Sequence, residues 1–221
     1  MLKEPEELYA LRHRWGRLIE VWVAYHTFLN REVEVGPNKI CMDEFIVHQT
    51  THTLLSIYYS YLYSLFDKSG IDFFKVIKTI EKDLTNEESE TVDKIRDIWT
   101  QIERPIEMLR HNIGFHGGKK SKSLQYGYSQ FKEFNPILPE TLMKYLRVFF
   151  RFMQIKYVAK EPMVSTPTTD QNIAILELAN EEYAVAKKLN LNNIFSSIDT
   201  ESSTNNEQLL NFILNMLKDF K

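Results

Sequence analysis

The chain has 221 residues, of which 43% are hydrophobic and 26% are charged, as is usual for a globular protein. Its 27 basic and 30 acidic residues give a formal charge of −3, which excludes a protein drawn to nucleic acid or anionic membrane by its overall charge. Binding to a polyanion would therefore require a local cluster of basic residues.

Long helices are expected, because Gly and Pro, the residues that interrupt them, occur only 7 times each. Four long segments show apolar residues at the three- and four-residue spacing of a helix that is buried on one face. The first covers about 6–33. The second begins after Asp43 and ends before the sequence DKSG at 67–70, and a short helix over 71–82 follows.

The third long helix is predicted to begin after Thr85, because Thr85 and Glu88 have the spacing of a capping box. Its apolar stripe continues to Ile113. Pro105 falls inside this run, where it removes one backbone donor and is expected to kink the helix. The fourth long helix begins near Pro139, a residue suited to a first turn.

Each long helix has one apolar stripe and a polar back, so each needs partners to bury the stripe. The simplest arrangement is an all-α fold, an antiparallel up-down four-helix bundle over 1–160. A linker rich in Pro, Ser and Thr is expected over 161–171. A C-terminal helical segment over 172–221 would add helices at about 172–189 and 206–219.

The expected compartment is reducing, because the single cysteine, Cys41, has no partner in the chain for a disulfide. The first residues, MLKEPEELYAL, lack the apolar core of a signal peptide. The longest apolar run, 54–66, is too short to span a bilayer and contains Tyr and Ser. We therefore expect a cytoplasmic protein with no membrane partner.

Polar and basic residues crowd together in EMLRHNIGFHGGKKSK, residues 107–122, at the end of the third long helix. Arg110 would lie at the edge of the packed face, about 40° around the helix from Ile106. Gly114 favours a turn rather than a continued helix. Such a turn would bring His116 back beside Arg110 in a basic pocket.

These residue types suit cleavage of a phosphodiester without a metal ion. An imidazole takes a proton from a hydroxyl near neutral pH, so His116 would activate the 2′-OH of an RNA. A guanidinium binds phosphate oxygens in pairs, so Arg110 would stabilise the charge that develops during attack. Flanking phosphates would be held by three lysines: Lys119, Lys120 and Lys122.

The order Arg110, HNIGF, His116 resembles the signature of the HEPN superfamily, in which four to six residues separate Arg from His and a polar residue commonly follows the Arg. The preceding sequence YSYLYSLFD, at 59–67, makes the layout similar to the abortive-infection U type of this superfamily. The resemblance covers roughly 5–158.

The resemblance implies a metal-independent endoribonuclease without a cofactor, often a toxin or a phage-defence effector. It implies a homodimer in which two motifs form one cleft, with RNA as substrate and an antitoxin or regulatory protein as a further partner. Arg110 and His116 would be the catalytic pair, supported by His111 and Asn112. Many relatives that are adenylylated by an antitoxin carry Tyr two residues after the His, whereas this chain has Gly118.

Other interpretations of 107–122 remain open. The stretch is also consistent with an ordinary helix C-terminus without a binding role, in which His and Lys offset the helix dipole and Gly caps the helix. A HEPN-like module without catalysis would use the same pocket to bind a nucleotide, an RNA or an acidic partner helix. Apolar residues near the end of the chain would then dock a partner: Leu209, Leu210, Ile213, Met216 and Leu217.

A helical-bundle metalloprotein is the remaining alternative. His48 and His52 have the four-residue spacing of metal ligands on one helix face, and His26 would supply a third ligand. Both residues of the pair also fall on the packing stripe, where a histidine commonly hydrogen-bonds inside a core. Asp67, which directly follows the aromatic run of the second helix, is a candidate for orienting a motif residue.

Overall fold

The computed structural model of the chain describes residues 3–29, 44–113, 126–127, 129–158 and 169–188. These residues are all-α, with no strand among them. Six α-helices are defined: α1 (Glu6–Leu29), α2 (Glu44–Ser64), α3 (Phe73–Ile80), α4 (Asn86–Asn112), α6 (Ile137–Met153) and α7 (Thr169–Lys188). In the described parts of the chain, no helix has the length and apolar character needed to cross a membrane.

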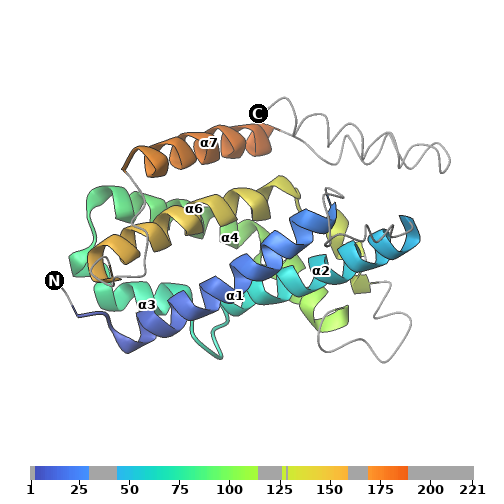
Figure 1. Cartoon of the computed structure of the whole chain (residues 1–221), viewed down its shortest axis with the longest axis horizontal. Helices are drawn as coiled ribbons and strands as arrows, with labels where there is room; N and C mark the ends of the chain where they lie inside the picture. The colour runs from blue at the N-terminus through green and yellow to red at the C-terminus, as the bar shows by residue number, and fades with distance from the viewer. Residues whose placement is uncertain (1–2, 30–43, 114–125, 128, 159–168, 189–221) are drawn as a thin grey trace, which may run out of the picture.

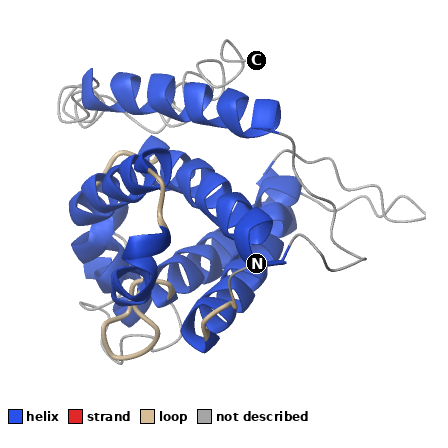
Figure 2. Cartoon of the chain, turned by 90° about the vertical axis from the view of Figure 1, so that its left-hand side faces the viewer, coloured by secondary structure: helices blue, strands red, loops and turns tan. Residues whose placement is uncertain are grey.

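The long helices pack as a bundle. Helix α1 contacts α2, α2 contacts α4, and α4 contacts α6. Trp15 of α1 stacks on Phe150 of α6, with ring centroids 5.0 Å apart, which closes the ring of four helices. Helix α7 packs against α6 on the outside of this ring, as the helix at the top of Figures 1 and 2 shows.

The core is rich in aromatic rings. Phe66, just after α2, stacks on Trp99 of α4 at 4.1 Å between centroids. Phe73, the first residue of α3, meets Phe149 of α6 edge to face at 5.2 Å. Such pairs add roughly 0.5–1.5 kcal/mol each to the free energy gained by burying the rings. The short helix α3 thereby fills one end of the bundle.

The predicted capping box is confirmed. The Thr85 backbone N–H donates to Glu88 Oε2 at 2.7 Å, and the Glu88 backbone N–H donates to Thr85 Oγ1 at 3.3 Å. Pro105 lies inside α4 as predicted, and the helix continues beyond it to Asn112. The predicted cap at Asp43 lies outside the described residues.

The later helices begin close to their predicted positions. Pro139 lies in the first turn of α6, and a π-helical turn, Gln154–Val158, extends the helix at its other end. Helix α7 begins at Thr169, inside the stretch expected to be linker, where Asp170 complements the positive end of the helix dipole. The helix predicted at 206–219 lies outside the described residues.

Candidate functional site

Arg110 lies in the last turn of α4, with its guanidinium held on two sides. Its Nη1 donates to Asp67 Oδ2 at 3.1 Å, and its Cζ lies 4.8 Å from the centroid of the Tyr63 ring. The side chains of Arg110 and Asp67 are 23% and 18% exposed. The cation is therefore fixed in position and still open to solvent.

Asp67 is itself fixed by the turn that follows α2. Its Oδ1 accepts from the Ser69 hydroxyl at 2.6 Å and from the Ser69 backbone N–H at 2.9 Å. The hydroxyl contact, the backbone contact and the Arg110 guanidinium lower the pKa of Asp67. The carboxylate thus stays ionised at neutral pH, and the structure places it on a motif residue, as the sequence indicated.

Tyr63 and His111 meet at Glu107, one turn before Arg110 on α4. The Tyr63 hydroxyl donates to Glu107 Oε1 at 3.4 Å, and burial followed by the nearby carboxylates raises the pKa of Tyr63. His111 Nε2 lies 3.9 Å from Glu107 Oε1, and its side chain is 48% exposed. His111 is therefore on the open side of α4, next to Arg110 in the sequence.

The chain returns to the end of α4 at Gly127. A Cβ added to Gly127 would lie 2.7 Å from both Asn112 Cβ and Ile113 Cγ1, so only glycine allows this close approach. The Asn112 amide donates to the Met108 carbonyl at 2.7 Å and so is engaged within its own helix. Residues 114–125 therefore connect two points that are in contact.

The remaining motif residues lie outside the described part of the chain: His116, Lys119, Lys120 and Lys122. Chain length still limits where they can be. An extended chain spans at most about 3.6 Å per residue, so the Cα of His116, three residues past Ile113, is within about 11 Å of the Ile113 Cα. Only the sequence spacing therefore links His116 to Arg110, which precedes it by six residues.

Two of the three histidines of the metal alternative, His26 and His52, have side chains among the described residues. His26 Nε2 lies 2.9 Å from Glu140 Oε2, which also accepts from Trp22 Nε1 at 2.9 Å. The His52 ring packs 6.1 Å from that of Phe131, and the His48 side chain lies outside the described residues. Among the residues that are described, no three of the His, Cys, Asp and Glu side chains could share a metal ion.

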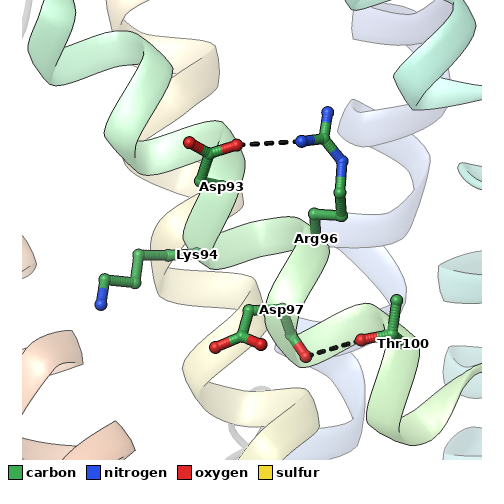
Figure 3. Close-up of a pocket in the computed structure, with 5 residues that line it drawn as sticks. All are labelled: Asp93, Lys94, Arg96, Asp97 and Thr100. Atoms are coloured by element: carbon green, nitrogen blue, oxygen red, sulfur yellow. Dashed lines mark hydrogen bonds and ion pairs between the residues drawn. The ribbon is translucent and has the colours of Figure 1, made fainter.

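A second surface feature of α4 is a shallow hollow lined by five residues, shown in Figure 3: Asp93, Lys94, Arg96, Asp97 and Thr100. Arg96 Nη1 lies 2.9 Å from Asp93 Oδ1 along the helix, whereas Asp97 Oδ2 accepts from the Tyr183 hydroxyl of α7 at 2.5 Å. Thr100 precedes Arg110 by ten residues, or about 15 Å of helix axis. The hollow is thus separate from the candidate site.

The described part of the candidate site is therefore the Arg110 guanidinium, which Asp67 and Tyr63 hold in position and which is open to solvent. Sequence reasoning missed Glu107, because its hydrogen bond with Tyr63 joins α4 to α2. Compared with protein-family models, with curated proteins and with solved structures, the chain matches none. Its function must be argued from this geometry and from the motif.

Proposed function

We propose that the chain is a HEPN-type, metal-independent endoribonuclease built on an antiparallel up-down four-helix bundle of α1, α2, α4 and α6. The observation that carries the proposal is the position of Arg110, held by Asp67 and Tyr63 at the end of the third long helix. His116 follows six residues later, at the spacing of the superfamily signature.

The proposed reaction uses the RNA itself as nucleophile. His116 accepts the proton of the 2′-OH as that oxygen attacks the adjacent phosphorus. The bond from phosphorus to the 5′ oxygen breaks, and the products are a 2′,3′-cyclic phosphate and a free 5′-OH after that oxygen takes up a proton. No metal ion or other cofactor takes part.

Arg110 stabilises the charge that develops on the phosphate oxygens during the attack. A guanidinium carries five N–H donors, so the hydrogen bond to Asp67 occupies only part of its capacity. Lys119, Lys120 and Lys122 bind flanking phosphates, while His111 supports the bound strand from the exposed side of α4.

In this proposal the protein acts as a homodimer in which two motifs share one cleft, in a cytoplasmic toxin or phage-defence role. An antitoxin or regulatory protein would restrain it. Gly118 argues against restraint by adenylylation of a Tyr at that position. Light scattering at micromolar concentration tests the dimer, and a monomer there would contradict the shared cleft.

The test is cleavage of a mixed, 5′-labelled RNA pool by the pure protein in EDTA. We expect cleavage that leaves 2′,3′-cyclic phosphate ends and that disappears in Arg110→Ala and His116→Ala. Matched controls are Arg104→Ala, an exposed arginine of the same helix, and His13→Ala, an exposed histidine of α1, both of which should cleave like wild type.

Three results would contradict the proposal. Undiminished cleavage by either motif variant would show that the site is elsewhere. RNA binding without cleavage by the folded wild-type protein would assign the same residues to a non-catalytic module. Cleavage lost in EDTA and restored by a metal ion would instead favour the histidine-based metalloprotein.

A further inference from the structure

Helix α6 carries a row of basic side chains next to α7. Lys144, Arg147 and Arg151 follow one another at intervals of three and four residues, which places them along one side of the helix. Arg147 is exposed, whereas Lys144 and Arg151 are partly buried. None of the three belongs to the candidate cleavage site, which lies at the end of α4.

Side chains of α7 cover the two ends of this row. Lys144 Nζ lies 2.5 Å and 2.6 Å from the two carboxylate oxygens of Glu182. Arg151 Nη1 donates to Oδ1 of Asn172 at 3.4 Å, and Asn172 is only 2% exposed. A carboxylate and an amide oxygen of α7 thus occupy positions that oxygens of a bound anion would take.

Arg147 and Arg151 lie four residues apart on α6 and so are on the same side of the helix. Burial, and then repulsion from Arg147, lower the pKa of Arg151. Like charges on adjacent turns of one helix destabilise each other, and a phosphate between them would relieve the repulsion. A bound anion would therefore stabilise the charges of Arg147 and Arg151 more than the side chains of α7 alone do.

The docking of α7 is polar compared with the aromatic contacts inside the ring. Only three apolar residues of α7 are buried in the core, Ala179, Tyr183 and Ala186. Leu176 packs partly buried against the core, and polar contacts also join α7 to the bundle, such as the Tyr145 hydroxyl donating to Asn180 Oδ1 at 2.6 Å. Interfaces of this kind resemble those that associate reversibly.

We propose that Lys144, Arg147 and Arg151 form a phosphate-binding surface for single-stranded RNA, and that α7 covers this surface and competes with the RNA for it. The choice of RNA as the polyanion rests on the proposed function, whereas the competition with α7 does not. Salt would weaken the binding, because each phosphate contact releases counterions.

The test measures binding of a short, labelled single-stranded RNA by fluorescence anisotropy, in the full-length protein carrying His116→Ala to prevent cleavage. Glu182→Gln removes the charge that covers Lys144, and we expect it to tighten binding about threefold to fivefold. Glu181→Gln makes the same change at the neighbouring exposed position and should leave the affinity unchanged.

Adding Arg147→Ala and Arg151→Ala to Glu182→Gln should remove the gain in RNA affinity. Hydrogen exchange of the α7 backbone amides should be faster in Glu182→Gln than in Glu181→Gln. An equal gain in the two glutamine variants would overturn the proposal, as would faster exchange of α7 without tighter binding. The same gain for a polyglutamate peptide would overturn the assignment to RNA.

These outcomes are separate from those of the cleavage assay. A wild-type protein that does not cleave RNA, combined with the gain in Glu182→Gln, would leave the surface in place and remove the nuclease. Cleavage that depends on Arg110, with no effect of substitutions at Glu182, Arg147 or Arg151 on RNA binding, would support the nuclease and contradict the phosphate-binding surface.

Discussion

The two ends of α4 each hold a cation against a carboxylate, and the two pairs are built differently. At the beginning, Lys156 Nζ lies 2.5 Å from Glu88 Oε2, and the side chains are 18% and 7% exposed. At the end, Arg110 lies 3.1 Å from Asp67, with 23% and 18% of the side chains exposed.

The difference lies in how many hydrogen-bonding groups are already used. Glu88 accepts from the Thr85 backbone as well as from Lys156, and Lys156 Nζ also donates to the Asp83 carbonyl at 2.5 Å. That pair closes the start of the helix. The Arg110 guanidinium has more donors than Asp67 can accept, which is what an anion site needs. In the proposed function, stability and cleavage therefore depend on opposite ends of one helix.

The largest expected effect is on cleavage at the Arg110 end. Removing one oriented donor that stabilises transition-state charge costs about 10²–10³ in rate, so Arg110→Ala should lose at least that factor in kcat. Its free energy of unfolding should change by about 1 kcal/mol or less, because the pair with Asp67 is partly exposed. Single-turnover cleavage and urea unfolding measure the two quantities.

The Glu88 end should show the opposite behaviour. Glu88→Ala leaves the partly buried Lys156 without its carboxylate and removes the capping box, which should lower the free energy of unfolding by about 2–4 kcal/mol. Cleavage per folded molecule should not change. Urea unfolding of Glu88→Ala beside Glu87→Ala, an exposed neighbour, checks this, and equal losses in the two variants would contradict the assigned role of Glu88.

Acid should reduce the contribution of the pair between Arg110 and Asp67 to the free energy of unfolding, because it protonates Asp67. The folded-state pKa of Asp67 is below its ordinary value of 3.8, so its contribution to stability is fully present above that value and is lost as the pH falls through the lowered pKa. The difference in unfolding free energy between wild type and Asp67→Asn should therefore be constant from about pH 5 to 7 and shrink below about pH 4. A constant difference down to pH 3 would contradict this.

The smallest expected effect is that of the ring beneath Arg110. A cation over an aromatic ring is stabilised by about 0.5–1 kcal/mol at an exposed site, so Tyr63→Leu should slow cleavage only about twofold to fivefold. Tyr63→Phe keeps the ring and loses only the 3.4 Å bond to Glu107, and it should cleave nearly like wild type. Equal slowing in both variants would assign the effect to the hydroxyl instead.

The sequence predicts a contact between two side chains more readily when the two residues are close together along the chain. Thr85 and Glu88 are three residues apart, so spacing alone predicted their mutual hydrogen bonds, and the structure confirms them. Arg110 and Asp67 are 43 residues apart, so the sequence could name both without showing that they meet. Their contact depends on how α2 packs against α4, which no local pattern encodes.

His26 shows the same limit. The sequence offered it as a third metal ligand beside His48 and His52, and it pairs with Glu140, 114 residues later, which no local signal connects to it. The start of α7 was also expected a few residues too late, because Pro, Ser and Thr before Thr169 indicated a linker. The four long helices were predicted well, since their apolar spacing repeats over many turns.

The contact of Gly127 with the end of α4 has a consequence for how the chain can vary. Because both ends of the connection 114–125 are anchored to the same place, changing its length alters mainly the entropy of closing a loop. Doubling the length costs only about 0.6 kcal/mol. An insertion or deletion within 114–125 need not disturb the packing of Gly127 against Asn112 and Ile113, so the length and sequence of this stretch can vary while the fold of the described helices stays the same.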